Sequence, residues 1–147
     1  MRVVRRKARA DDAHRVLSDV ADVTAQELDA IGVKPEVRPI FIEKLIDGSD
    51  AYAYTADGVP VFLIGFHKEA ANRVTTWFAG TKLLFDAGVG GILMSRRCMR
   101  EIAARHPMAA FESTSYSKHP DAERWFKVLG YQPIEVNKEF TRYRFVN

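Results

Sequence analysis

A glycine-rich turn between two apolar segments is the feature that most constrains the fold of this chain. The turn Asp86-Ala87-Gly88-Val89-Gly90-Gly91 follows a strand-like segment and leads into a helix-like segment that begins at Ile92. Glycines at such a junction leave backbone N–H groups at the helix start bare, which is the local chemistry of an anion-binding turn. A turn that needs positive φ angles and tight packing, with no ligand, explains the same glycines. The pattern therefore predicts a strand-to-helix unit and leaves anion binding open.

A helix, a strand and a further helix follow the glycine turn. Apolar residues recur at helical spacing from Gly91 to Arg105, and His106-Pro107 ends that helix because a residue before proline disfavours helical geometry. Met108 to Tyr116 is predicted as a strand and Pro120 to Leu129 as a helix. The residues expected on the buried side of the first helix are Ile92, Leu93, Cys98, Met99 and Ile102.

Antiparallel strands are predicted before the turn. Asp57-Gly58 is a strong hairpin signal between Ala51–Ala56 and Val59–Phe66, and the second segment is an almost continuous apolar run, as expected of a central strand. His67 to Asn72 is predicted as the next turn, and Arg73 to Thr81 as a returning strand rich in threonine and aromatic residues. The three strands would form a meander.

The N-terminal third is predicted to be mostly helical. Val3 to Ala8 alternates apolar and basic residues, as in a half-exposed strand, and an Asp suited to capping a helix follows. Helices are predicted from Asp11 to Val23, from Thr24 to Ile31 and from Pro35 to Ile46. The residues expected on the buried side of the third helix are Ile40, Phe41, Leu45 and Ile46.

Two closing strands, Tyr131 to Val136 and Phe140 to Val146, complete the order β-α-α-α-β-β-β-α-β-α-β-β. Only the later segments need crossover helices, so the sequence predicts a mixed α/β layer architecture. At 147 residues the chain has the usual size of one domain, which would span residues 1–147 and bury enough surface for a core without disulfides.

Composition excludes several classes of protein. A single cysteine, Cys98, cannot form an internal disulfide, and it lies in an apolar helical pattern, which indicates a buried thiol and a reducing compartment. No apolar segment follows the basic N-terminus as in a secretory signal, and no run approaches the roughly 18 apolar residues of a membrane span. We therefore expect a cytoplasmic protein without a membrane span.

Basic residues are spread along the chain apart from a cluster between Arg2 and Arg9. The formal net charge is only +3, which attracts polyanions weakly unless it is focused on one face. Lysine and arginine commonly guard exposed edge strands, so a solvated edge strand explains the cluster better than a nucleic-acid-binding module does.

This order and several residue patterns resemble the fold of the GNAT (Gcn5-related N-acetyltransferase) superfamily over nearly the whole chain. Val4 to Ala13 is similar to the family's first strand and the Asp-Ala start of its first helix, and the Asp57-Gly58 hairpin is similar to its second and third strands. His119 to Tyr131, which ends in Leu-Gly-Tyr, resembles the family's late motif of Asn, Ala, Tyr and Leu-Gly-Phe. The resemblance implies a GNAT-like acyl-CoA N-acyltransferase fold: a central, twisted, mostly antiparallel sheet of about seven strands flanked by helices.

A narrower resemblance is to the small internal virion protein of T7-like tailed phages and to related phage and prophage GNAT-like proteins. It implies a phage or prophage origin, a place in the host cytoplasm or in a phage particle, and other phage proteins as partners. The short features that carry it are Glu27 and Gly32 before Pro35, Gly58-Val59-Pro60, Trp77-Phe78, and Ser117-Lys118-His119 with Arg124, Lys127 and Gly130.

In the GNAT family an amine attacks the thioester of acetyl-CoA, which binds as a dissociable cosubstrate. The family's phosphate-loop motif carries Gln or Arg where this chain has Phe85, so a basic residue further along the helix would have to supply the missing charge. The cofactor-binding residues that the resemblance implies are Gly88, Val89, Gly90 and Gly91, with Arg96 and His119 as further candidates.

The catalytic positions match the family less well. Phe126 stands where the family has the Tyr that protonates the departing thiolate, and phenylalanine cannot donate a proton. Tyr116 or Ser115, at the end of the preceding strand, is therefore the candidate acid, and Glu112 or His67 is the candidate base; of these, Glu112 and Tyr116 are the catalytic candidates. No cluster of His, Cys, Asp or Glu has metal-ligand spacing. The resemblance assigns the amine-bearing acceptor to Ala21–Asp50, a stretch without a diagnostic residue.

Two functions from different classes remain as hypotheses. The first is an acetyl-CoA-dependent N-acetyltransferase, motivated by the predicted topology and the glycine turn. The second is a catalytically degenerate GNAT fold that acts as a phage virion-associated structural or interaction protein, motivated by Phe85 and Phe126 at chemically demanding positions. An exposed closing strand could pair between subunits, which leaves a homodimer open.

Overall fold

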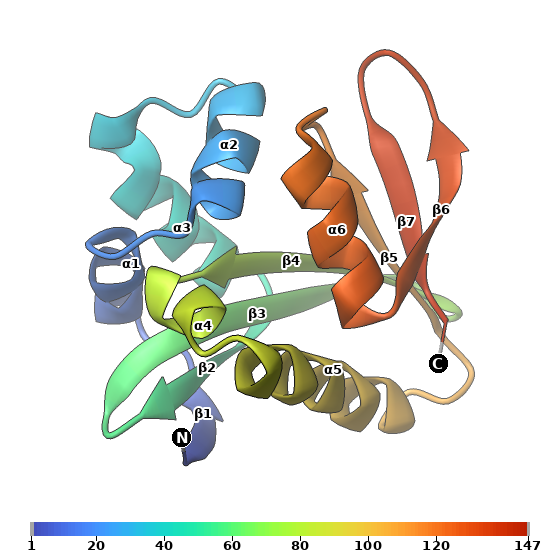
Figure 1. Ribbon diagram of the computed structural model, residues 1–147. Helices are drawn as coiled ribbons and strands as arrows, with labels where there is room; N and C mark the ends of the chain where they lie inside the picture. Colours follow the sequence, from blue (N-terminus) through green and yellow to red (C-terminus); the bar gives the residue numbers. More distant parts are fainter. Residues whose placement is uncertain (1, 147) are drawn as a thin grey trace.

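The computed structural model describes residues 2–146, apart from the side chain of Val89 (Figure 1). Its centre is a seven-stranded sheet in the order β1-β2-β3-β4-β5-β7-β6. The strands are β1 (Val3–Lys7), β2 (Asp50–Ala56), β3 (Val59–Ala70), β4 (Arg73–Gly80), β5 (Ala110–Ser115), β6 (Tyr131–Val136) and β7 (Thr141–Phe145). Every neighbouring pair is antiparallel except β4 and β5, which are parallel. The predicted mixed α/β architecture with a mostly antiparallel sheet of about seven strands is confirmed.

Helices cover both faces of this sheet. They are α1 (Ala10–Leu17), α2 (Asp22–Ala30), the short 3-10 helix η1 (Pro35–Val37), α3 (Arg38–Asp47), α4 (Lys82–Asp86), α5 (Val89–Ala104) and α6 (Pro120–Leu129). On one face, Leu63 of β3 packs in a core cluster with Val16 of α1 and Ile42 of α3. On the other face, Phe62 and Ile64 belong to the cluster that also contains buried residues of α5 and α6. Because successive strand residues point to opposite faces, β3 contributes to both cores.

The strand β3 is central, as its apolar sequence predicts, but it is longer than predicted. Every residue from Pro60 to Phe66 is buried, whereas the residues from His67 to Ala70 are exposed and still pair with β4. The predicted turn at His67–Asn72 is therefore wrong, because the hairpin shortens to Ala71 and Asn72. Polar side chains on the exposed end of a ladder do not stop backbone pairing, so hydrophobicity alone marks the strand end too early.

The predicted first helix, from Asp11 to Val23, is interrupted in the structure. The segment between α1 and α2 pairs with the end of β4: Val20 forms an antiparallel bridge with Thr81, and the Lys82 N–H donates to Asp19 O at 2.8 Å. These contacts require an extended backbone, so the helix stops after Leu17 and a second one starts at Asp22. The strand-like segment predicted before the glycine turn is likewise wrong, because Phe85 lies in α4.

Three apolar residues predicted to be buried are exposed instead. Ile40 of α3 is 55% exposed, and Ile92 and Leu93 in the first turns of α5 are 39% and 62% exposed. The helical period of α5 is confirmed further along, where Cys98, Met99 and Ile102 are buried. Ile92 and Leu93 lie on the solvent-facing side of α5, which continues through Arg96 and Arg97, whereas Gly91 and Ser95 belong to its buried side.

The two edges of the sheet are β1 and β6. The predicted basic edge strand is confirmed, since β1 pairs only with β2 among the described strands. On β6 all residues after Tyr131 are exposed, and pairing of this strand between subunits stays a prediction. Within residues 2–146, no helix combines the length and the apolar character that crossing a membrane requires.

A buried ion pair fixes β1 to the start of α1. The Asp12 side chain is fully buried, and its carboxylate accepts two hydrogen bonds from the Arg6 guanidinium, both at 2.7 Å, and one from the Arg9 N–H at 2.7 Å. Burial by itself raises the pKa of Asp12, but the hydrogen bonds from Arg6 and Arg9 outweigh it, so the pKa lies below its ordinary value. The negative charge of Asp12 is therefore stabilised in the folded state.

We expect Asp12→Asn to lower the free energy of unfolding at pH 7 by roughly 2–4 kcal/mol, because it leaves the Arg6 guanidinium without its buried partner. A carboxylate whose pKa is lowered by folding contributes stability above its unfolded pKa, about 3.9, and loses it as the pH falls through the folded value. The gap between wild type and variant should therefore stay constant above about pH 5 and narrow as the pH falls below about 4 in urea denaturation.

The neighbouring exposed carboxylate supplies the control for this prediction. Asp11 lies 3.9 Å from Arg9 and both side chains are largely exposed, so Asp11→Asn should change stability by less than about 0.5 kcal/mol. Equal effects of the two substitutions, or a gap for Asp12→Asn that does not depend on pH, would contradict this assignment.

Candidate functional site

The sheet splits between its two parallel strands. Pairing of β4 with β5 covers only three residue pairs, from Arg73 with Ala110 to Thr75 with Glu112. Side chains hold the strands one step further, because Ser113 Oγ donates to Thr76 O at 2.9 Å. Beyond this point the strands separate, and α2 and α6 lie over the opening (Figure 1). An open crevice at the carboxyl ends of parallel strands is a common place for ligands in α/β proteins.

Backbone groups of β4 face this opening. Gly80 uses both of its groups on that side, since its N–H donates to Thr24 Oγ1 at 3.0 Å and its C=O accepts from the Ala21 N–H at 2.9 Å. Groups two residues apart in a strand point the same way, so the N–H and C=O of Phe78 face the same opening, between Gly80 and Thr76. No described strand pairs with β4 there, which leaves one donor and one acceptor for an extended ligand.

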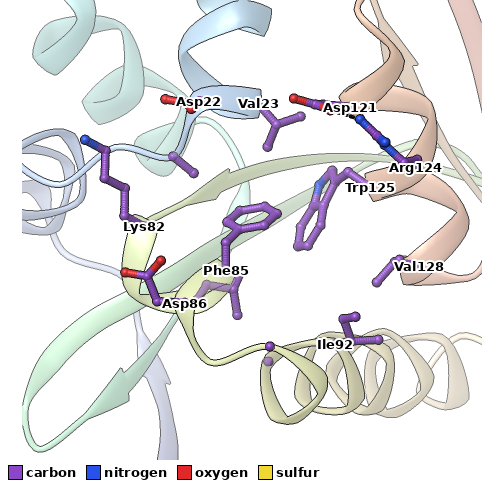
Figure 2. A pocket seen from close by; sticks show the side chains of 14 residues that line it. Asp22, Val23, Lys82, Phe85, Asp86, Ile92, Asp121, Arg124, Trp125 and Val128 are labelled. Atoms are coloured by element: carbon purple, nitrogen blue, oxygen red, sulfur yellow. Dashed lines mark hydrogen bonds and ion pairs between the residues drawn. The ribbon is translucent and has the colours of Figure 1, made fainter.

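A cavity of about 530 Å³ lies at the end of this opening, and we call it the glycine-turn cavity (Figure 2). Four elements enclose it: the start of α2, α4, the start of α5 and one side of α6. The lining residues are Ala21, Asp22, Val23, Lys82, Leu84, Phe85, Asp86, Gly88, Gly91, Ile92, Asp121, Arg124, Trp125 and Val128.

The glycine turn forms the start of α5 at this cavity. Gly88 adopts φ 60° and ψ −130°, a backbone conformation that favours glycine, and its N–H donates to Phe85 O at 3.1 Å. Gly91 allows α5 to approach α4 closely, because a Cβ there would lie 2.2 Å from Leu84 O. The first-turn N–H groups of Val89, Gly90 and Gly91 lack intrahelical acceptors, and no described side chain caps them. The helix start therefore offers three N–H donors to an anion.

Of the four predicted loop residues, Gly88 and Gly91 line the cavity and Gly90 is exposed beside it. Val89 begins α5, but its side chain lies outside the described part of the structure.

Charged side chains of both signs rim the glycine-turn cavity. Lys82 and Arg124 supply positive charge, whereas Asp22, Asp86 and Asp121 supply negative charge. Arg124 forms an ion pair with Asp121, its neighbour on α6 (Figure 2). The two basic residues come from α4 and α6, on different sides of the cavity.

Two aromatic side chains that line the cavity, Phe85 and Trp125, pack against each other (Figure 2). The rings of Phe85 and Trp125 have centroids 5.0 Å apart and an interplanar angle of 49°. Phe85 stands where the resemblance implies a polar side chain, and here it builds an apolar wall. The cavity therefore combines a helix start with uncapped N–H groups and an apolar aromatic wall.

The other two predicted cofactor residues do not line the glycine-turn cavity. Arg96 is exposed on α5, one turn beyond the lining residue Ile92. His119 is the N-cap of α6, where its Nδ1 accepts a hydrogen bond from the Asp121 N–H at 3.2 Å. Arg124, which sequence reasoning assigned only to the phage resemblance, is the basic residue on α6 that lines the cavity.

A second cavity, of about 210 Å³, lies inside the split, and we call it the β4–β5 cavity. Val23 and Trp125 line both cavities, so the two adjoin. The lining residues are Val23, Thr24, Glu27, Leu28, Ile31, Phe41, Ile42, Leu45, Thr76, Trp77, Phe78, Ser113, Thr114, Tyr116, Ala122, Trp125 and Phe126.

Glu27 is the acidic residue of the β4–β5 cavity, and sequence reasoning missed this placement. Its Oε2 accepts from Ser115 Oγ at 2.6 Å and its Oε1 accepts from the Tyr116 N–H at 2.6 Å. These bonds tie α2 to the end of β5, across 88 and 89 positions of the sequence. The sequence offered one signal for this placement: Glu27 is a charged residue in the helical region that the resemblance assigns to acceptor binding. No spacing pattern links Glu27 to Ser115, so the sequence could not predict their contact.

The predicted catalytic residues fall in different places. Tyr116 lines the mouth of the β4–β5 cavity, is 46% exposed, and stacks on Phe140 with centroids 6.2 Å apart. Glu112 is buried and lines neither of these two cavities; its Oε2 accepts a 2.7 Å hydrogen bond from Arg144 Nη2, and Arg142 Nε lies 3.9 Å from its Oε1. Glu112 is therefore engaged in a cross-strand ion pair on β5 and β7 and does not face the opening.

Phe126 forms part of the aromatic wall of the β4–β5 cavity. It is buried and stacks on Tyr143 with centroids 4.3 Å apart and an interplanar angle of 9°. As its sequence implies, this position supplies no hydroxyl group.

Two alternative chemistries, a cysteine nucleophile and a metal centre, lack the side chains they need among the described residues. Burial raises the pKa of the Cys98 thiol to about 12, so it is protonated at neutral pH and is a poor nucleophile. Among residues 2–146, no group of three His, Cys, Asp or Glu side chains could hold a metal ion.

Comparison with known proteins identifies the fold. No protein-family model matches the chain, and no curated protein sequence matches it. Solved structures do. A GNAT-family acetyltransferase from Bacillus anthracis is 14% identical with a TM-score of 0.68, over 99% of this chain and 95% of that one. The PaiA N-acetyltransferase from Thermoplasma acidophilum, solved in complex with coenzyme A, is 9% identical with a TM-score of 0.69, over 100% of both chains.

A third match is the GNAT domain of S. lividans PAT, 16% identical with a TM-score of 0.66, over 96% of this chain and 88% of that one. At identities this low the likeness shows the fold alone. Nothing in these comparisons supports a phage virion protein. The chain has the GNAT fold, with a seven-stranded, mostly antiparallel sheet that is open between β4 and β5.

Proposed function

We propose that this protein is an N-acyltransferase that moves an acetyl group from acetyl-CoA to an amine. One observation carries the proposal: a strand edge with free backbone groups leads directly to a helix start with free N–H groups, in adjoining cavities. A ligand with an amide-containing arm and a pyrophosphate matches both ends. The structural neighbour from T. acidophilum, which was solved with coenzyme A, supports this ligand class.

The residues present fit such a ligand. The N–H groups of Val89, Gly90 and Gly91 would hold the pyrophosphate, with Arg124 and Lys82 as the nearest basic groups of the cavity rim. The free N–H and C=O of Phe78 would pair with amides of the pantetheine arm. Acetyl-CoA supplies the acyl group as a thioester.

The chain itself supplies positioning and proton transfer. Holding the amine and the thioester together at the split between β4 and β5 removes much of the entropic cost of bringing them together. Because Phe126 has no hydroxyl and Glu112 lies outside both cavities, Tyr116 is our candidate for the proton donor to the departing thiolate. Tyr116 lines the β4–β5 cavity and its side chain is partly exposed, so its phenol is available to a ligand bound there.

Acetyl-CoA binding tests the cofactor site directly. At a concentration 100 times Kd, a ligand that binds only the folded state adds about 2.7 kcal/mol of stability, which should raise Tm by roughly 5–10 °C in a thermal-shift titration. Gly90→Asp should weaken binding at least about tenfold, because its carboxylate would occupy the first-turn N–H groups and repel the phosphates.

Gly90→Ala is the matched control for this substitution. No atom lies within 4 Å of a Cβ built at Gly90, and its φ is not positive, so alanine fits without strain. It should bind acetyl-CoA within about threefold of wild type. Absence of any Tm shift at millimolar acetyl-CoA in the wild type would refute the cofactor assignment.

Two arginine variants test which basic residue reaches the phosphates. Arg124→Gln should weaken acetyl-CoA binding by roughly tenfold, the value of one charge-assisted hydrogen bond, measured by calorimetry at constant salt. Arg96→Gln should change it less than twofold, because Arg96 does not line the cavity. The reverse order would return the phosphate-binding role to Arg96, as the sequence predicts.

Tyr116→Phe tests the proton donor. The phenylalanine ring keeps the stacking on Phe140, so the Kd for acetyl-CoA should stay unchanged. Loss of a general acid should lower kcat by roughly 100-fold or more, measured from the release of free thiol. A kcat within threefold of wild type would rule out this role.

A further inference from the structure

We propose that the acyl acceptor is a small primary amine with an apolar body and no carboxylate, bound in the β4–β5 cavity with its ammonium group on Glu27. This inference rests on the proposed function, which supplies the reaction but says nothing about the acceptor. It assigns to Glu27 the recognition of the substrate charge. For transfer, the ammonium group would first give one proton to the Glu27 carboxylate, and the neutral nitrogen would form the C–N bond at the thioester carbonyl carbon while the C–S bond breaks. The thiolate would take a proton from Tyr116, and the Tyr116 phenolate would regain one from the new amide nitrogen.

The walls of the β4–β5 cavity favour an apolar body. Aromatic rings come from three sources: Phe41 on α3, Trp77 and Phe78 on β4, and Trp125 and Phe126 on α6. Leu28 and Leu45 close the side formed by the N-terminal helices. Transfer of apolar surface from water into such a cavity is favourable by about 25 cal/mol per Å². A volume of about 210 Å³ is smaller than a typical drug-sized site, which limits the acceptor to a small molecule.

The charge of the cavity favours a cation. Among the described residues that line it, Glu27 is the single acidic residue, and none is lysine, arginine or histidine. An ammonium ion in this cavity would therefore meet one carboxylate and no repelling charge. Moving a charged group from water into an apolar site costs desolvation free energy. This cost is offset only where an opposite charge and hydrogen-bond partners are already in place.

Hydrogen bonds hold the Glu27 carboxylate in one place and leave it room to accept more. Each oxygen accepts one bond, from Ser115 Oγ and from the Tyr116 N–H. A carboxylate has about four acceptor sites, so roughly two remain for an ammonium donor. Fixing the side chain before the ligand arrives reduces the rotamer entropy lost on binding. The carboxylate is thus a preorganised receptor for one N–H₃⁺ group.

The same features argue against other amines. A free amino acid would bring a carboxylate into a cavity whose described lining has no basic partner for it. A polyamine would bring a second ammonium group against the aromatic walls without a second carboxylate. A peptide that presents a lysine side chain would also place its backbone amides against the apolar walls of the cavity. Each of these acceptors would leave a charged or polar group without a partner. A binding site strongly rejects a substrate that leaves such a group unpaired.

Four probes separate these classes in one assay. We expect 2-phenylethylamine to be acetylated by the wild-type protein with a kcat/KM roughly 100-fold or more above that for phenylalanine, which differs by the carboxylate. Spermidine and Nα-acetyl-lysine amide should likewise be poor acceptors. Direct calorimetric titration with 2-phenylethylamine, without acetyl-CoA, should detect binding to the same protein.

Glu27→Gln tests the anchor. It should raise the KM for 2-phenylethylamine by roughly tenfold or more while the Kd for acetyl-CoA changes less than threefold, because the helix start that would hold the pyrophosphate lies in the glycine-turn cavity, which Glu27 does not line. Glu27→Asp, which keeps the charge, should lie between wild type and Glu27→Gln. Glu36→Gln, the same change at an exposed residue of η1 outside both cavities, should match the wild type. Melting curves confirm that each variant is folded.

The outcomes distinguish this inference from the proposed function. Acetyl-CoA binding together with preference for phenylalanine, spermidine or the lysine amide would overturn the acceptor class and leave the acyltransferase standing. An unchanged KM in Glu27→Gln would overturn the anchor. Binding of 2-phenylethylamine without binding of acetyl-CoA would support the cavity assignment and overturn the acyltransferase.

Discussion

Side-chain hydrogen bonds around Thr76 hold the point at which the sheet splits, and the candidate site depends on them. Thr76 Oγ1 lies 2.7 Å from the Tyr131 hydroxyl and donates to Glu112 O at 3.2 Å, while Ser113 Oγ donates to Thr76 O at 2.9 Å. Burial raises the pKa of Tyr131, so its hydroxyl keeps its proton at any ordinary pH and remains a stable partner. Buried polar atoms at the split are thus satisfied without further strand pairing. Because these side chains form the hydrogen bonds, the end of β4 can leave its backbone groups unpaired while the core beneath the strand stays well packed.

The N-terminal helices then give that opening its shape and its charge. Thr24 Oγ1 accepts from the Gly80 N–H of β4, and the Glu27 carboxylate accepts from the end of β5, so α2 contacts both sides of the split. Thr24 and Glu27 are three residues apart and therefore lie on the same face of α2. This one helix thus sets both the width of the opening and the negative charge of the β4–β5 cavity. Any change in the seating of α2 would alter both cavities, since Val23 lines each of them.

Local chemistry predicted much of the fold. The helix Pro120–Leu129 has the predicted bounds, because His119 caps its start and Gly130, with φ 100°, ends it. The predicted Asp57-Gly58 hairpin is confirmed as well, because both residues adopt the positive φ angles that a tight hairpin turn requires. Errors arose where tertiary contacts override the local pattern, as at the break after α1, which exists because that segment pairs with the end of β4.

Prediction of the site was partial for a related reason. Gly88, Gly91 and Tyr116 line the cavities because short-range features, a helix start and a strand end, place them. Glu112 and Arg96 have suitable chemistry, yet the direction in which each side chain points depends on neighbouring strands and helices. Glu27 was not predicted, since its partners lie 88 and 89 residues away.

By itself the sequence determined most of the elements and their order, the mixed α/β architecture and the glycine turn at a helix start, because these follow from periodicity, hairpin residues and caps within a few positions. Only the tertiary structure decided which face each element buries, where β4 and β5 separate, and that a carboxylate from α2 enters the gap. Those features depend on contacts between residues far apart in the chain, and no local spacing encodes them.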